Sequence, residues 1–373
     1  MSAGEPTPLD RRLRETIRAE GPMRLDRFWN IALFDRDHGY YTSRDPFGET
    51  GDFTTAPEIS QMFGELLGAW LVAAWRGMGR PSPFLLCEIG PGRGSLMADI
   101  LRSVGQLDRD MLRAARVRLV ETSDRLATRQ IERLSRFDLP IGRHRRLGEL
   151  EPLPLLLVGN ELLDAIAIRQ IRFSAGAWRE CEVTLNDEGA LQLGDGAPLP
   201  AVPAALARLG TPTEGAVFEF SPERDRVVAD LSRHLVAHGG AAVLIDYGHA
   251  STGFGDTLQA LRRHRFASVL ERAGEADITS HVDFERVLEV ARGTGVRHAA
   301  ATTQGAFLLA LGLLERAGAL GAPLDEAGRA AVTQAVHRLA GNGPSDMGEL
   351  FKVAALSTLA LELPPFLSEG EFR

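Results

Sequence analysis

The chain has few cysteines and no long apolar segment, and both absences narrow what it can be. Its 373 residues include only two cysteines, Cys87 and Cys181, which are too few for a disulfide framework or a thiolate zinc site and are typical of a reducing compartment. No apolar run approaches the length of a transmembrane helix. The N-terminal residues mix acidic side chains with arginines, unlike a signal or transit peptide. We therefore expect a cytoplasmic protein without membrane insertion.

Excess positive charge and several catalytic signatures are also missing. The formal net charge of -8 argues against a general nucleic-acid binder, because phosphate contacts need clustered lysines and arginines. The one dense basic patch, residues 143–146, is expected to be a solvated loop. The sequence holds neither a Gly-x-Ser-x-Gly elbow nor a Walker glycine-lysine loop. His281 has no second histidine at ligand spacing, so we expect no metal site.

The chain does contain enough apolar sequence for a large core. Hydrophobic residues make up 44% of it, which allows one large domain with insertions, or two domains. Helical spacing runs through residues 9–35, with a break at Gly21 and Pro22, and again from Ile59. From about residue 84, strands alternate with helices, which predicts a mostly parallel sheet covered on both faces. The strand candidates are residues 84–89, 117–120, 153–158, 241–245, 296–300 and 350–356.

Residues 168–194 follow a different pattern, in which apolar and polar residues alternate across two turns. This pattern predicts an antiparallel ribbon inserted into the α/β core. The expected organisation is an N-terminal helical region with an active-site loop (1–80), the first half of the core (81–167), the ribbon with a proline-rich return (168–215), and the second half of the core with the C-terminal region (216–373).

The strongest functional signal is a glycine-rich turn after the first strand candidate. Glycines let the backbone approach a ligand closely, and a helix N-terminus behind the turn offers unpaired N–H groups. NAD-binding folds use Gly-x-Gly-x-x-Gly for a pyrophosphate. Here a carboxylate precedes Gly-x-Gly-x-Gly, which suits the positively charged S-adenosylmethionine better. A purely structural turn is the alternative. The residues assigned to the cofactor are Glu88, Gly90, Pro91, Gly92 and Gly94.

Polar residues also follow the later strand candidates. Glu121 closes the second one, where an acidic residue can accept both ribose hydroxyls; otherwise it begins a solvated loop. Asn160, Glu161 and Asp164 follow the third, at the carboxyl edge where open α/β sheets bind ligands. The two carboxylates could instead complement a helix dipole. Asp246 occupies the same kind of edge after the next strand, where a plain turn is the other interpretation.

Two further segments allow both a functional and a local structural interpretation. Residues 51–58 could form a loop over the cofactor, with Thr54 in contact with it, or Thr55 and Glu58 could form a capping box for the following helix. Residues 274–284 include His281, a candidate for acid–base chemistry. In that segment Thr279 or Ser280 could cap a helix beginning near residue 283.

These segments occur together and in one order, at residues 51–65, 88–94, 160–165, 245–248 and 281–284. In this combination the chain resembles the MidA-like family of S-adenosylmethionine-dependent methyltransferases, over residues 20 to about 357. The resemblance implies a Rossmann-like class I methyltransferase fold, with a mostly parallel seven-stranded sheet, an N-terminal helical addition and an inserted antiparallel ribbon. Mitochondrial members of this family are complex I assembly factors that methylate an arginine of a core complex I subunit.

The resemblance therefore implies a protein arginine methyltransferase that forms symmetric dimethylarginine on a complex I subunit. A guanidinium is protonated at neutral pH, so carboxylates must hold it in a fork. Glu161 and Asp164 are the leading candidates for this clamp, followed by Glu58, Asp246 and His281. Two other functions stay open: a non-catalytic assembly chaperone that binds S-adenosylmethionine, and an NAD-dependent oxidoreductase.

Overall fold

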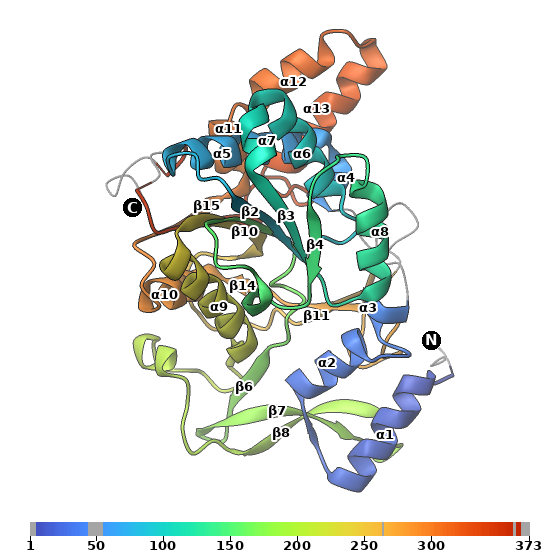
Figure 1. Ribbon diagram of the computed structural model, residues 1–373. Coiled ribbons are helices and arrows are strands. Elements are labelled where there is room, and N and C mark those ends of the chain that lie inside the picture. Colours follow the sequence, from blue (N-terminus) through green and yellow to red (C-terminus); the bar gives the residue numbers. More distant parts are fainter. Residues whose placement is uncertain (1–4, 44–54, 263–264, 361–362, 367–373) are drawn as a thin grey trace. The chain divides into compact units, whose positions relative to one another are not determined.

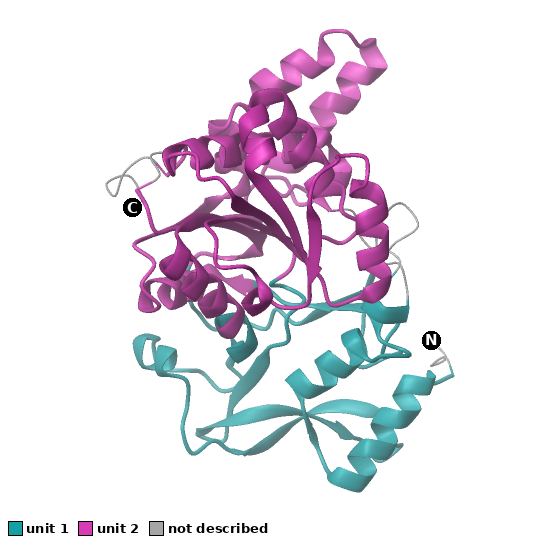
Figure 2. Cartoon of the chain, viewed as in Figure 1, with its two compact units in different colours: residues 1–53, 163–225, 251–281 teal, residues 54–162, 226–250, 282–373 magenta. Residues whose placement is uncertain are grey.

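The computed structural model describes residues 5–43, 55–262, 265–360 and 363–366. The chain divides into two compact units, which Figure 2 shows in different colours. Unit 1 comprises residues 1–53, 163–225 and 251–281, and unit 2 comprises residues 54–162, 226–250 and 282–373. Within the described ranges, no helix combines the length and the apolar character needed to cross a membrane.

Unit 2 is built on a sheet whose path holds seven strands among the described residues. In spatial order they are β15 (His298–Thr303), β16 (Phe351–Ser357), β10 (Gly240–His249), β5 (Leu155–Asn160), β2 (Phe84–Ile89), β3 (Ala115–Val120) and β4 (Ile141–His144). The pairs from β10 to β4 are parallel, whereas β16 is antiparallel to both of its neighbours. A short strand, β14 (Val282–Asp283), pairs in parallel with β10. The predicted mostly parallel, seven-stranded sheet is confirmed.

The edge strand β4 is the one strand of this path that the sequence pattern misses. Its sequence, Ile-Gly-Arg-His, has a single large apolar residue and no alternation that would predict a strand, and all four residues are half-buried. The expectation of a solvated loop at residues 143–146 is therefore wrong for its first two residues, which pair with β3. Arg143 and Arg145 both form ion pairs with Asp124.

Helices cover both faces of this sheet (Figure 1). On one side lie α5 (Gln61–Gly77), α6 (Ser95–Leu107) and α7 (Arg109–Ala114), and on the other lie α9 (Pro222–His238) and α10 (Phe284–Gly293). The other helices of the unit are α4 (Ala56–Ile59), α8 (Asp124–Leu134), η1 (Leu147–Glu149), α11 (Gln304–Ala310), α12 (Leu313–Gly321) and α13 (Glu326–Ala340).

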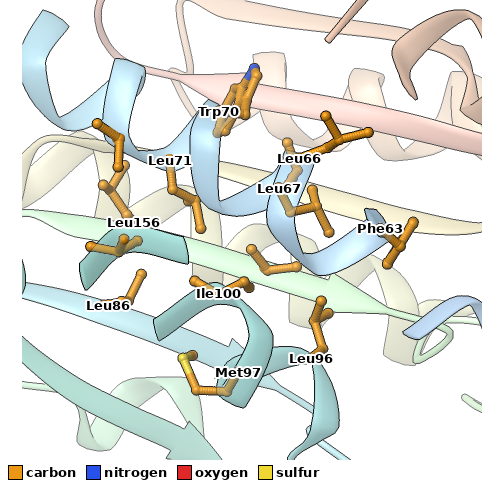
Figure 3. Packing of buried hydrophobic residues seen from close by; sticks show 14 of the residues in the cluster. Phe63, Leu66, Leu67, Trp70, Leu71, Leu86, Leu96, Met97, Ile100 and Leu156 are labelled. Carbon is orange, nitrogen blue, oxygen red and sulfur yellow. The ribbon is translucent and has the colours of Figure 1, made fainter. Parts of the chain in front are cut away.

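The core of unit 2 joins α5 and α6 to the central strands (Figure 3). Leu86 of β2 and Leu156 of β5 belong to the same buried cluster as Leu67 and Trp70 of α5 and Ile100 of α6. Burying one such side chain contributes about 1.5–3 kcal/mol relative to leaving it exposed. This packing fixes β2 and β5, whose carboxyl ends carry most of the candidate site residues.

Unit 1 contains the predicted ribbon and two N-terminal helices. A five-stranded sheet holds β1 (Met23–Arg24), β7 (Ala177–Leu185), β6 (Arg169–Ser174) and β9 (Val217–Phe220), with β8 (Leu191–Pro198) also paired to β7. A second sheet holds β12 (Arg265–Ala267), β11 (Gln259–Arg262) and β13 (Asp277–Thr279). The helical elements are α1 (Pro8–Glu20), α2 (Leu25–Phe34), α3 (Tyr40–Ser43) and η2 (Ala204–Arg208). The antiparallel pairing of β6 with β7 confirms the predicted ribbon.

The predicted break between the two N-terminal helices is also confirmed, because Gly21 ends α1 with a φ of +91°. The predicted cap of α10 is wrong. Thr279 belongs to β13, and Asp283 itself caps the helix by accepting the N–H of Arg286 at 3.0 Å.

Candidate active site

The glycine-rich turn joins the end of β2 to the start of α6 in unit 2. Gly90, Gly92 and Gly94 have φ values of +66°, +51° and +74°, which residues with a side chain rarely adopt. Gly94 is the N-cap residue of α6 and provides no side-chain cap, so N–H groups of the first helical turn stay available to a ligand. Pro91 lies inside this turn, and its carbonyl accepts the N–H of Gly94 at 2.7 Å.

Glu88 lies one residue before the end of β2 and is only 3% exposed. Its carboxyl group accepts the backbone N–H of Met97 in α6, while Oε2 is buried without a hydrogen-bond partner. Burial is the largest cause that raises the pKa of Glu88, to about 8. A positively charged ligand beside this carboxyl group would favour its ionised form.

Glu121 follows β3 and is buried as well. One of its oxygens accepts the N–H of Ser123 at 2.7 Å, and the other accepts Nε2 of Gln130 at 3.0 Å. The backbone N–H of Thr122 also donates to this carboxyl group, which keeps acceptor capacity for a ribose hydroxyl. Burial, the largest cause, raises the pKa of Glu121.

Gln130 is a site residue that the sequence reasoning missed. It is fully buried on α8, and its Nε2 also donates to the carbonyl of Gly92 at 2.8 Å. Gln130 therefore ties Glu121 to the glycine turn. The signal that could have revealed it is a polar residue four positions from both Leu126 and Leu134, on the buried stripe of the helix.

The carboxyl end of β5 carries Asn160 and Glu161. Oε1 of Glu161 accepts Nδ2 of Asn160 at 3.0 Å and the N–H of Ala56, the first residue of α4, at 3.2 Å. Oδ1 of Asn160 is buried without a partner. Asn160 thus presents an unsatisfied acceptor at the same sheet edge as the glycine turn, because β5 and β2 are adjacent parallel strands.

Asp246 of β10 is fully buried and accepts two backbone N–H groups. Oδ1 accepts the N–H of Tyr247, and Oδ2 accepts the N–H of Leu162, both at 3.1 Å. A carboxyl group bound in this way fixes the backbone that follows β5.

Glu58 lies on α4 and faces the glycine turn. Its Oε1 is 3.8 Å from Nη1 of Arg93, and its Oε2 is buried without a partner. The capping-box interpretation is wrong, because the side chain of Thr55 makes no capping hydrogen bond at α4. Thr54, assigned to the cofactor, lies outside the described residues.

Asp164 and His281 belong to unit 1, whereas Glu161 belongs to unit 2. Oδ1 of Asp164 accepts the N–H of Ala165 at 2.8 Å. The buried guanidinium of Arg224 joins the two segments, because it donates to the carbonyl of Asp164 at 3.1 Å and to that of His281 at 2.8 Å. In unit 1, the backbone carbonyls of both candidates thus accept hydrogen bonds from the same buried arginine.

A comparison with protein families agrees with the geometry of the glycine turn. The model of a family of S-adenosyl-L-methionine-dependent methyltransferases matches residues 66–302, more than half of the chain. The chain belongs to this methyltransferase family. Its buried polar atoms fit the cofactor, since Oε2 of Glu88 and Oδ1 of Asn160 are acceptors without a partner and the cofactor carries cationic and hydroxyl groups.

Curated relatives and solved structures extend this similarity along the chain. The Drosophila melanogaster protein arginine methyltransferase NDUFAF7 homolog, mitochondrial, is 34% identical over 80% of this chain and 74% of its own length. The Mus musculus protein arginine methyltransferase NDUFAF7, mitochondrial, is 32% identical over 94% of this chain and 84% of its own. A crystal structure of a candidate methyl transferase from Burkholderia thailandensis, bound to S-adenosyl-homocysteine, superposes with a TM-score of 0.81 at 28% identity, covering 95% of both chains.

Membership of the family establishes the enzyme class and the cofactor. The chain is a methyltransferase that uses S-adenosylmethionine, and the expected class I methyltransferase fold is confirmed. The alternative of an NAD-dependent oxidoreductase is therefore wrong. The expectation of a cytoplasmic location is contradicted as well, because the curated relatives are named as mitochondrial proteins.

Proposed function

We propose that this methyltransferase transfers the methyl group to an arginine side chain of a protein substrate. The Drosophila and mouse relatives are named as protein arginine methyltransferases, and the mouse protein aligns with 94% of the chain. This breadth supports the same chemistry here. The finer parts of the proposal, symmetric dimethylarginine as the product and a core complex I subunit as the substrate during assembly, rest on the family resemblance.

The acceptor is the difficult partner in this reaction. When bound, S-adenosylmethionine supplies a methyl group that its sulfonium already activates, so the protein mainly orients the acceptor and excludes water. A guanidinium has a pKa above about 12 and a delocalised lone pair. Carboxyl groups must therefore hold it as a fork, with one nitrogen directed at the methyl group.

The observation that carries the proposal is the position of Glu161 beside the glycine turn. The next residue, Leu162, has its Cδ1 only 2.8 Å from where a Cβ on Gly90 would lie. Glu161 is thus one residue from a direct contact with the cofactor turn. Glu58, which has an unpartnered buried oxygen, is a further candidate for binding the substrate in unit 2, and Asp164 and His281 are the candidates that unit 1 offers.

The test is methyl transfer from isotope-labelled S-adenosylmethionine into an extract of cells that lack this gene. Wild-type protein should label a protein band, and mass spectrometry of that band should find methylated arginine. Glu161→Gln should bind the cofactor like wild type but transfer methyl groups about a hundredfold more slowly, because the clamp loses a charge. Gly92→Val should abolish both, because its φ of +51° does not suit valine.

The exposed Glu132→Gln variant is the matched control, and it should retain cofactor binding and transfer. Equal loss of both properties in Glu161→Gln would instead make Glu161 a cofactor or folding residue. Wild-type protein that binds the cofactor but labels no protein would contradict the proposal and favour the assembly chaperone.

A further inference from the structure

Glu161 is held in a backbone conformation that its side chain disfavours. Its φ is +51°, in the left-handed region that costs a residue with a Cβ about 1–2 kcal/mol. Such strain persists only where surrounding contacts enforce it, and it concentrates at functional sites. The contacts that enforce this conformation are therefore part of how Glu161 is presented.

Strand β10 provides these contacts on one side of the turn. The N–H of Glu161 donates to the carbonyl of Ile245 at 2.9 Å, and the N–H of Leu162 donates to Oδ2 of Asp246 at 3.1 Å. Asp246 is fully buried, and its other oxygen accepts the N–H of Tyr247. Both ends of the carboxyl group are thus anchored to backbone, which fixes the direction in which the chain leaves β5.

The glycine turn limits the same segment on its other side. A Cβ on Gly90 would lie 2.8 Å from Cδ1 of Leu162, so the side chain of Leu162 packs closely against the turn at Gly90. The segment that carries Glu161 is therefore hydrogen-bonded to β10 on one side, and its Leu162 side chain packs against the glycine turn on the other.

We propose that Asp246 is a positioning residue for methyl transfer. It holds the N–H of Leu162, keeps Glu161 in its left-handed conformation, and so directs the carboxyl group of Glu161 toward the acceptor. This inference rests on the proposed function of Glu161 and changes the role of Asp246 from a substrate ligand to a support of the residue that binds substrate.

The first test compares Asp246→Asn with wild type in steady-state kinetics and cofactor binding. The amide keeps the volume, but its NH2 group must face one of the two N–H groups, so one of the two hydrogen bonds, to Leu162 or to Tyr247, is lost. We expect kcat to fall at least about tenfold, with the Kd for S-adenosylmethionine within about twofold of wild type. The matched control is Asp108→Asn, because Asp108 also accepts two backbone N–H groups, at the N-terminus of α7. It should lower Tm and leave kcat unchanged.

The second test measures the strain itself and needs no substrate. Glu161→Gly and Glu161→Ala remove the same carboxyl group, but only glycine relieves a positive φ. In the wild-type background the glycine variant should have the higher Tm. In the Asp246→Asn background this difference should disappear, because the released turn can relax. If Asp246→Asn does not fold, Asp246→Ser replaces it.

Wild-type kcat in Asp246→Asn, or a glycine-alanine difference that survives the loss of Asp246, would overturn the inference. A wild-type enzyme that methylates no protein arginine would contradict the proposed function instead, while the Tm comparison would still decide whether Asp246 holds the turn.

Discussion

Replacing Glu88 with glutamine should uncouple cofactor binding from proton release. Burial raises the pKa of this carboxyl group to about 8, so at pH 7 about nine-tenths of the free enzyme carries a proton there. The bound cofactor brings a sulfonium charge, which favours the ionised form. Binding at pH 7 should therefore release about 0.9 proton from wild-type Glu88 and none from Glu88→Gln.

Because binding is coupled to the ionisation of Glu88, the affinity for S-adenosylmethionine should depend on pH. Between pH 6 and pH 7 the ionised fraction of a group with a pKa of about 8 rises from about 1% to about 9%. The affinity of wild type should rise about ninefold over this interval, which corresponds to about 1.3 kcal/mol. The affinity of Glu88→Gln should be constant there, since the variant has lost the titrating group.

Stability should change with pH in the opposite sense. The folded pKa of Glu88 lies above its ordinary value of 4.5, so the folded apoenzyme binds this proton more tightly than the unfolded chain does. The resulting stabilisation is full below about pH 4.5 and is lost as the pH rises through about 8. The Tm difference between the variant and wild type should therefore shift in favour of the variant from pH 5 to pH 8.

Isothermal titration calorimetry in buffers of different ionisation enthalpy measures both the protons released and the affinity. Glu132→Gln, an exposed substitution on α8, serves as the control and should behave as wild type. If wild type releases no proton at pH 7 and binds equally well at pH 6, the reasoning is refuted. Glu88 would then be ionised before the cofactor arrives, or it would not face the charge of the cofactor.

Three further substitutions test contacts outside the proposed clamp. Gln130→Leu removes both hydrogen bonds that tie Glu121 to the glycine turn and should weaken S-adenosylmethionine binding about tenfold by calorimetry; unchanged affinity would argue against a role for Gln130 in the site. Lys352, the only lysine in the chain, donates hydrogen bonds to three backbone carbonyls. A planar guanidinium cannot direct its donors at the same three oxygens. Lys352→Arg should therefore lower the free energy of unfolding, measured in urea, by about 1–3 kcal/mol. The hydrogen bond from Arg118 lowers the pKa of Glu151 to about 2. The contribution of this ion pair to stability is therefore full above about pH 4.5 and declines toward pH 2. The Tm of Glu151→Gln should fall less than that of wild type between pH 6 and pH 3, and equal falls would contradict this.

Much of the site could be predicted from sequence because its parts are local. A carboxylate followed by Gly-x-Gly-x-Gly needs no distant partner to indicate a close backbone approach to a ligand, and the positive φ values of these glycines agree with it. Glu121 and Asn160 could be placed at the same sheet edge because parallel strands end together at their carboxyl ends. The alternation of strands and helices predicted the parallel sheet, because each of these elements is indicated by the pattern of its own residues.

The tertiary structure decided what depends on segments far apart in the chain. Gln130 bonds to Gly92, 38 residues away, and nothing in its own helix reveals that partner. Asp246 reaches Leu162 across 84 residues, so its sequence position predicted an edge residue but not a support for another turn. The left-handed backbone of Glu161 has no sequence signature either, because glutamate disfavours that conformation and the segment is held by residues far along the chain, such as Asp246 and Ala56. By itself the sequence determined the kinds of groups at the sheet edge, and the packing of distant strands determined which of those groups hold the others in place.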